Sequence, residues 1–181
     1  QYTGNGSVVL NGRNGDNDIG GMVGTVDFGV NGTGELQIGD GVNLTTGTTG
    51  IQFANANDAT MVFNGTSIVI GDLGGNTTGR STFAEIIAGY STESDVTFQG
   101  DVYTGSFVIG NESKVNVANG KSIISTSVLD GGDGDNILNY LGSTTLHSDI
   151  GDDVDSLSEV NFNTENNNIT QTIDKNIYAR T

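Results

Sequence analysis

Several residue types are missing from this sequence of 181 residues, and each absence narrows the classes of protein that remain. Cysteine is absent, which excludes disulfide bonds, thiol nucleophiles and cysteine metal ligands. A chain without cysteine suits export in an unfolded state through an oxidising compartment, where a stray disulfide would block passage. Proline and tryptophan are absent too, and a lack of proline is unusual for a disordered chain.

Basic residues are scarce, since 6 Lys and Arg stand against 22 Asp and Glu, for a formal net charge of −16. Such a surface repels nucleic-acid phosphates and anionic lipid headgroups, so we expect neither as a direct ligand. It attracts divalent cations or a basic protein surface, and it keeps strand edges from pairing. No apolar run has the length of a membrane-spanning helix, so we expect no membrane insertion by this segment. The sequence starts at Gln1 without a signal peptide, as expected of a mature protein or an excised piece.

The abundant residues favour short strands joined by tight turns. There are 29 glycines, and Val, Ile, Phe, Tyr and Thr gather in short segments bounded by Gly, Asn or Asp, which tolerate turn conformations. The longest helix-compatible stretch, residues 81–88, suits a strand equally well. Strands are predicted at Ser7–Leu10, Gly24–Val30, Glu35–Ile38, Thr60–Phe63, Ser67–Ile70, Asp95–Phe98, Ser106–Ile109, Lys114–Val117, Ile137–Tyr140 and Val160–Phe162.

Two short units recur along the chain. Apolar-x-Ile-Gly occupies residues 36–39, 68–71 and 107–110, and apolar-x-aromatic-x-Gly occupies residues 61–65, 96–100 and 138–142. Phe28, Phe63 and Phe98 are evenly spaced, 35 residues apart. In stacked coils, alternation points every second side chain inward, equivalent positions form columns, and glycine supplies the corners.

We therefore predict an all-β fold, a right-handed parallel β-helix (β-solenoid) that takes up residues 1–181 as one segment of a larger region. The expected coil length is about 20–25 residues. The alternative is an immunoglobulin-like or jelly-roll β-sandwich with strands every 8–12 residues. The recurring units and the absence of Pro and Trp favour the solenoid.

Three stretches near the C-terminus carry a family resemblance. They follow one order: residues 139–151 (NYLGSTTLHSDIG), 157–163 (LSEVNFN) and 176–179 (NIYA). Together they resemble a unit of the passenger regions of rickettsial surface cell antigen autotransporters, the outer-membrane-protein-A and -B-like family. The resemblance covers about Asp130 to Thr181. It implies a β-helical passenger on the outer-membrane surface of a bacterium, attachment to or invasion of host cells, assembly into a coat, and no catalytic residues.

The strongest local motif is residues 131–138 (GGDGDNIL), which is similar to the calcium-binding nonapeptide of RTX proteins. In that motif, glycines let backbone carbonyls converge and an aspartate supplies a hard oxygen ligand between coils. The candidate calcium ligands are Asp133, Asp135 and Asn136, although Asn136 stands where the motif has Asp and no second copy follows. The alternative is an ordinary Gly/Asp corner. No other cofactor is expected.

The sequence contains few groups of residues that could form a catalytic site. His147 is the sole histidine, so no two-histidine metal site exists, and the threonine-rich sequence around it explains Ser143 and Ser148 better than a catalytic triad does. Carboxylate pairs such as Glu93 and Asp95 have the chemistry of a glycosidase, but 22 acidic residues make chance pairs inevitable. We expect no enzyme.

These observations favour a non-catalytic, surface-exposed adhesin or coat segment that mediates attachment to host cells. Its expected partner is a host cell-surface protein or another copy of the chain, with no nucleic acid. The alternative is a structural subunit of a surface layer or extracellular filament that assembles by strand addition, with calcium as a stabilising ion.

Overall fold

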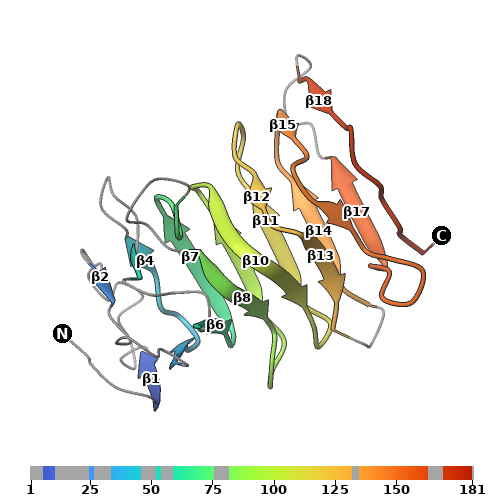
Figure 1. Cartoon of the computed structure of the whole chain (residues 1–181). Coiled ribbons are helices and arrows are strands. Elements are labelled where there is room, and N and C mark those ends of the chain that lie inside the picture. The colour runs from blue at the N-terminus through green and yellow to red at the C-terminus, as the bar shows by residue number, and fades with distance from the viewer. Residues whose placement is uncertain are drawn as a thin grey trace.

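The computed structural model describes residues 6–10, 25–26, 34–45, 52–53, 59–75, 82–131, 135–162 and 169–180. Within them every regular element is a β-strand (Figure 1). All strand pairs are parallel, as in the pairs β3–β6, β8–β10 and β11–β14. Sandwiches are built from antiparallel strands, so the predicted all-β solenoid is confirmed and the sandwich is excluded. In these residues no helix is long and apolar enough to cross a membrane.

The strands form two long sheets and one narrow face. The first sheet contains, in order, β1 (Gly6–Leu10), β3 (Gly34–Ile38), β6 (Thr60–Phe63), β8 (Phe83–Ala88), β10 (Val102–Ile109), β13 (Ser127–Asp130) and β16 (Asp149–Ile150). The second sheet contains β4 (Leu44–Thr45), β7 (Thr66–Ile70), β9 (Asp95–Phe98), β11 (Lys114–Val117), β14 (Ile137–Tyr140) and β17 (Glu159–Phe162). The third face contains β2 (Thr25–Val26), β5 (Gln52–Phe53), β12 (Ile123–Ile124), β15 (Thr144–Thr145) and β18 (Gln171–Thr172).

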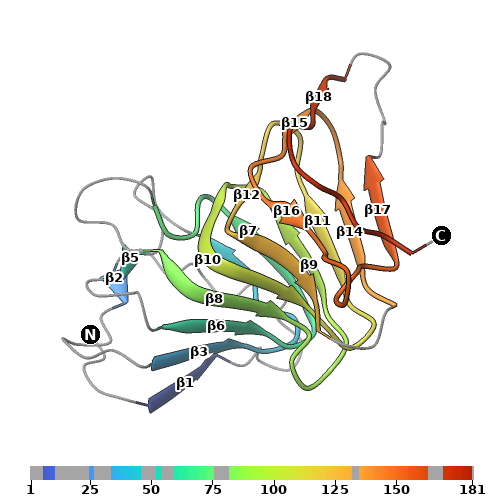
Figure 2. The same cartoon turned by 45° about the vertical axis from the view of Figure 1, so that its right-hand side comes forward.

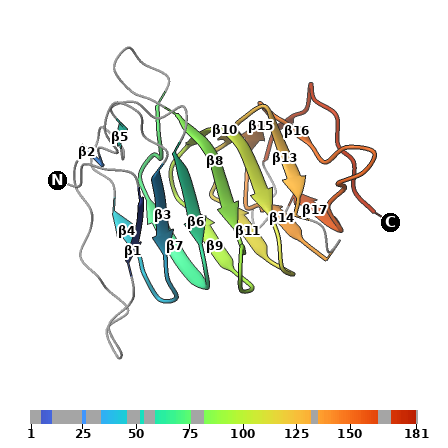
Figure 3. The ribbon, with the colours of Figure 1, turned by 60° about the horizontal axis from the view of Figure 1, so that its bottom comes forward.

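From β3 onward, each coil visits the first sheet, the second sheet and the third face in turn. Strands of the first sheet therefore lie one above another (Figure 2), and β1 and β17 lie at opposite ends of the stack (Figure 3). Thr60 pairs with Glu85, 25 residues later, and Phe107 pairs with Val128, 21 residues later. These intervals agree with the expected coil length. Longer coils also occur, because a corner can hold extra residues without disturbing the sheets.

Alternate side chains of each strand form the core. In β11, Val115 and Val117 are buried, whereas Lys114 and Asn116 are half-exposed. The parallel register aligns the buried positions of successive coils into columns. One column contains Val96, Val115 and Leu138, and the next contains Phe98, Val117 and Tyr140. Burial raises the pKa of the Tyr140 hydroxyl above its usual value.

The even spacing of the three phenylalanines is not the coil length. Phe63 lies in the first sheet and Phe98 in the second, and Phe28 lies outside the described residues. Phe63 and Phe98 meet across the core, with ring centroids 5.6 Å apart and planes at 88°. Phe98 also contacts Phe107 edge-on, at 5.8 Å. The 35-residue interval therefore joins two faces rather than two equivalent coil positions.

The three apolar-x-Ile-Gly units do not all point the same position into the core. Ile38 and Ile109 point into the core, but Ile70 is 44% exposed and its neighbour Val69 is buried instead. Val69 pairs with Leu44 and Phe98, both of which are buried. The column across coils therefore decides which residue faces inward, and the local sequence motif does not.

Glycine is required at one close approach between corners. A Cβ atom built on Gly100 would lie 2.0 Å from the carbonyl oxygen of Gly71 in the preceding coil. That distance is far below any van der Waals contact, so the backbones of the two coils can stack here only because position 100 lacks a side chain.

Candidate functional site

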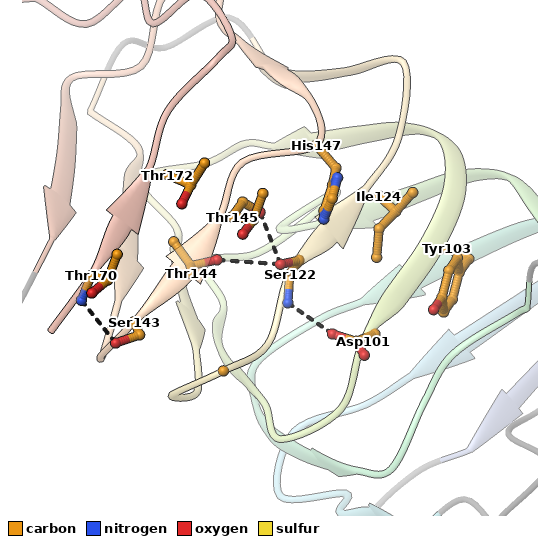
Figure 4. Close-up of a pocket in the computed structure, with 11 residues that line it drawn as sticks. Asp101, Tyr103, Ser122, Ile124, Ser143, Thr144, Thr145, His147, Thr170 and Thr172 are labelled. Atoms are coloured by element: carbon orange, nitrogen blue, oxygen red, sulfur yellow. Dashed lines mark hydrogen bonds between the residues drawn. The ribbon is translucent and has the colours of Figure 1, made fainter.

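A groove of about 580 Å³ lies on the third face, in the half of the solenoid nearer to β18 (Figure 4). Its walls come from four successive coils. The lining residues are Asp101, Tyr103, Gly120, Ser122, Ile124, Ser143, Thr144, Thr145, His147, Thr170 and Thr172. Six of these eleven side chains carry an aliphatic hydroxyl.

The groove exists because the third face is interrupted. The start of β10 pairs with β12, and β15 pairs with β18, but β12 and β15 belong to different sheets. Side chains bridge the interruption: Ser122 Oγ donates to the carbonyl of Thr145 at 3.0 Å, and Thr144 Oγ1 donates to the carbonyl of Lys121 at 2.8 Å. These bonds fix the floor of the groove without closing it.

Two carboxylates and one ammonium lie at the corner beside the groove. Asp101 Oδ1 accepts a hydrogen bond from the backbone N–H of Ser122 at 2.9 Å. Lys121 Nζ lies 3.7 Å from Asp101 Oδ2 and 4.0 Å from Asp72 Oδ1. The charge of Asp101 is therefore partly balanced by its neighbours, and the groove is less negative than the net charge of the chain suggests.

His147 lies at the exposed rim of the groove. The two serines near it in sequence have other bonds. Ser148 is buried, and its Oγ donates to the carbonyl of Ile123 at 3.0 Å. Ser143 Oγ accepts from the N–H of Thr170 at 3.0 Å. Both serines thus hold neighbouring coils together, as expected for a threonine-rich strand region.

The predicted calcium corner is partly described. Asp133 lies outside the described residues, and Asp135 is exposed. Asn136 is fully buried: its Oδ1 accepts from the N–H of Ser113 at 2.8 Å, and its Nδ2 donates to Asp130 Oδ1 at 2.8 Å. Within the part of the chain that the structure describes, no three His, Asp or Glu residues are grouped to hold a metal ion.

Asn136 belongs to a polar column at the corner that precedes the second sheet. The residues one position before β9, β11, β14 and β17 are Ser94, Ser113, Asn136 and Ser158. Ser94 N–H donates to Ser113 Oγ at 2.8 Å, which repeats the bond from Ser113 to Asn136 one coil further. In each step, a side chain satisfies a corner N–H that the sheet leaves unpaired. This column gives Asn136 a structural role without a metal.

The acidic turn that follows has the same character. Asp152 Oδ1 accepts from the N–H groups of Val154 and Asp155, both at 2.7 Å. These backbone hydrogen bonds, that of Asp155 first, lower the pKa of Asp152. An aspartate that accepts two local N–H groups forms an Asx-type turn.

Of the carboxylate pair considered for glycoside chemistry, Glu93 and Asp95, the second has structural partners. Asp95 Oδ2 lies 2.6 Å from Lys114 Nζ, and Asp95 Oδ1 accepts from Asn116 Nδ2 at 2.8 Å. Glu93 is exposed and precedes the strand. Asp95 therefore begins a network on the outer face of the second sheet.

That network continues as an asparagine ladder. Asn139 Nδ2 donates to Asn116 Oδ1 at 2.9 Å, and Asn161 Nδ2 donates to Asn139 Oδ1 at 3.0 Å. The three residues occupy one register position in successive coils. Stacked amides of this kind satisfy one another's donors and acceptors along the axis of a parallel stack. The outer face of the second sheet is therefore polar, and its side chains are hydrogen-bonded to one another.

The groove was not predicted from the sequence. Its residues span positions 101 to 172 and come from short strands, so they form no local motif. The one local signal was the run Ser143-Thr144-Thr145 beside the only histidine.

Comparison of the chain with protein-family models, with curated proteins and with solved structures finds no match. The resemblance to the rickettsial surface antigens remains a prediction from the sequence.

Proposed function

We propose that this chain is a non-catalytic segment of a bacterial surface protein, and that it mediates attachment to host cells through the outer surface of its solenoid. The observation that carries the proposal is the unbroken parallel stack. The first sheet has seven strands along its path from β1 to β16, and each pairs with the next. Such a stack is stiff along its axis, and it holds binding surfaces at a distance from the cell that displays them.

The side chains of the interior serve the fold. Buried residues form one continuous apolar core from Leu36 in β3 to Leu157 before β17. The polar residues at the corners bond to neighbouring coils, as Ser113 and Asn136 do. Recognition therefore falls to the outward side chains and to the groove on the third face.

A second function is favoured by the edge of the second sheet. Among the described strands, β17 pairs with β14 alone. Its residues Val160 and Phe162 are half-buried, and the Phe162 ring stacks on Tyr140 with centroids 5.6 Å apart and planes at 8°. Because no other described strand covers this edge, its backbone groups and apolar side chains suit strand addition by a second copy. The alternative is therefore a structural subunit of a surface layer or filament.

The test of the first function is attachment. Beads coated with the purified chain are incubated with cultured animal cells, and bound beads are counted after washing. The matched control is a bead coated at the same density with a β-solenoid of unrelated sequence. Attachment above that control supports the proposal, and attachment equal to it contradicts the proposal.

The test of the alternative is sedimentation velocity over a range of protein concentrations, with and without calcium. A subunit that assembles by strand addition shows particles that grow with concentration. A strict monomer at the highest concentration contradicts the assembly function.

A further inference from the structure

We infer that the groove on the third face binds neutral oligosaccharides. This inference builds on the proposed role in attachment, because it names the ligand class that the surface recognises. The groove is a single concave site of about 580 Å³, within the range of about 300–1,000 Å³ that is typical of small-molecule sites.

The hydrogen-bonding chemistry of the lining matches a sugar. Thr145, Thr170 and Thr172 are exposed or half-exposed, and all three line the groove. A hydroxyl both donates and accepts, and so does every hydroxyl of a sugar ring. A row of hydroxyl side chains therefore matches a polyol ligand better than it matches an ionic one.

An apolar patch lies on the opposite wall of the groove. Tyr103 and Ile124 are partners in the parallel pair of β10 and β12, and both are half-exposed (Figure 4). Neighbouring residues on one face of a sheet form a continuous surface. A pyranose ring has a face of C–H groups, which packs on such a surface while the hydroxyls at its edge reach the threonines.

The charge of the chain favours neutral sugars over acidic ones. The chain has a formal net charge of −16, which repels sialylated or sulfated glycans. The nearby cation, Lys121, already lies beside Asp101 and Asp72. Among the described residues that line the groove, Asp101 is the one carboxylate. A neutral ligand meets no repulsion, and Asp101 and His147 add polar partners at the rim.

The single carboxylate in the described lining indicates that the groove binds a sugar without cleaving it. Glycoside hydrolysis commonly requires two carboxyl groups that flank the scissile bond. The lining of the groove supplies one, Asp101. The described lining therefore has the groups needed to hold a sugar, but it does not contain the carboxylate pair needed to hydrolyse one.

The walls of the groove are fixed before the ligand arrives. The Ser122 and Thr144 hydroxyls are bonded to the carbonyls of Thr145 and Lys121, and Thr145 pairs with Thr172 in the β15–β18 sheet. A site on paired strands loses little conformational entropy when it binds. The groove is open to solvent, so we expect weak individual binding that many copies on one cell strengthen.

The experiment has two stages. The chain is first screened on an array of immobilised neutral and sialylated oligosaccharides, and the best neutral binder is then titrated in solution by calorimetry. The test variant combines Thr145→Val and Thr172→Val, which remove two hydroxyls and keep the β-branched shape. The matched control is Thr45→Val on the exposed side of β4, in the second sheet.

The expected result is binding to neutral oligosaccharides, a loss of about tenfold or more in affinity for the double variant, and no change for the control. Equal circular dichroism spectra and melting temperatures establish that the double variant is folded. The inference is overturned if no neutral oligosaccharide binds, if sialylated ones bind better, or if the double variant binds as the wild type does.

Bead attachment separates this inference from the proposed function. If wild-type and double-variant beads attach to cells equally, the role in attachment stands and the groove is not its site. If the double variant loses oligosaccharide binding but wild-type beads attach to no cell, the groove binds sugars and the role in attachment is wrong.

Discussion

Replacement of Asn136 by aspartate tests whether the corner before β14 is a polar column or a metal site. The Asn136 amide is fully buried between two partners, the N–H of Ser113 and Asp130 Oδ1, each at 2.8 Å. Asn136→Asp retains the shape of the side chain and the acceptor for Ser113. It replaces the donor Nδ2 with an oxygen that faces the carboxylate of Asp130. The substitution also restores the aspartate that the calcium nonapeptide carries at this position.

Two contributions set the size of the effect. A hydrogen bond to a charged group is lost, which costs about 1.5–3 kcal/mol. Two carboxylate oxygens at hydrogen-bonding distance repel each other, so the new carboxyl is ionised only at a higher pH when folded than when unfolded. We therefore expect the free energy of unfolding at pH 7 to fall by about 3 kcal/mol.

The pH dependence has a definite sign. A carboxyl whose folded pKa is raised above its unfolded value, about 3.9 for aspartate, destabilises the fold at every pH above that unfolded value. Below about pH 3.9 it is protonated in both states, and the protonated oxygen again donates to Asp130. The difference between variant and wild type should therefore shrink as the pH falls from 7 toward 4.

The assay is urea unfolding followed by circular dichroism across this pH range, with wild type and Asn119→Asp in parallel. Asn119 is exposed, and its Oδ1 accepts from the N–H of Ser143 at 2.8 Å, a bond that aspartate retains. The control should match the wild type within about 0.5 kcal/mol. An Asn136→Asp variant as stable as the wild type at pH 7 would refute the reasoning. So would a variant that calcium stabilises beyond the wild type, because binding to the folded state alone would then outweigh the repulsion.

Three further substitutions test other parts of the fold. Phe98→Ala should lower the free energy of unfolding by about 4 kcal/mol, because Phe98 is fully buried and contacts two other rings; a loss below 1 kcal/mol in urea unfolding contradicts this. Gly100→Ala should cost about 2 kcal/mol or more, because the new Cβ would lie 2.0 Å from the carbonyl oxygen of Gly71; an unchanged melting temperature is the contrary outcome. Asn139→Leu should cost about 2 kcal/mol, because it removes the middle rung of the ladder between Asn116 and Asn161. Asn161→Leu removes one described ladder bond instead of two and should cost less, and equal losses would argue against the ladder.

The sequence predicted those strands in which apolar and polar residues alternate clearly and which end at turn residues. The predicted bounds of Asp95–Phe98, Lys114–Val117 and Ile137–Tyr140 match β9, β11 and β14. Residues 81–88 are compatible with a helix, but they contain β8, because Ile86 and Ala88 each complete a column between β6 and β10. That pairing joins residues more than twenty positions apart, so no local pattern contains it.

The two-residue strands and the buried polar residues could not be predicted from the sequence. β12 and β15 are too short to show any periodicity. In β13, Asp130 occupies one of the alternate positions that point into the core. A prediction from alternating apolar and polar residues expects an apolar side chain there. The calcium-like motif was recognised, but its Asn136 bonds to a corner N–H one coil away. The groove depends on the interruption between β12 and β15, which only the three-dimensional register shows.

The parallel register has a mechanical consequence. Every strand runs across the direction in which the coils stack, so tension applied along the rod pulls one strand away from the next and loads the hydrogen bonds at the end of the stack first. A coil that detaches releases its full contour: the 21 residues between Phe107 and Val128 extend to about 70 Å at roughly 3.3–3.6 Å per residue. Under the drag of fluid flow, such a protein would lengthen in steps of one coil instead of breaking at one load, and the coils still stacked would keep their shape.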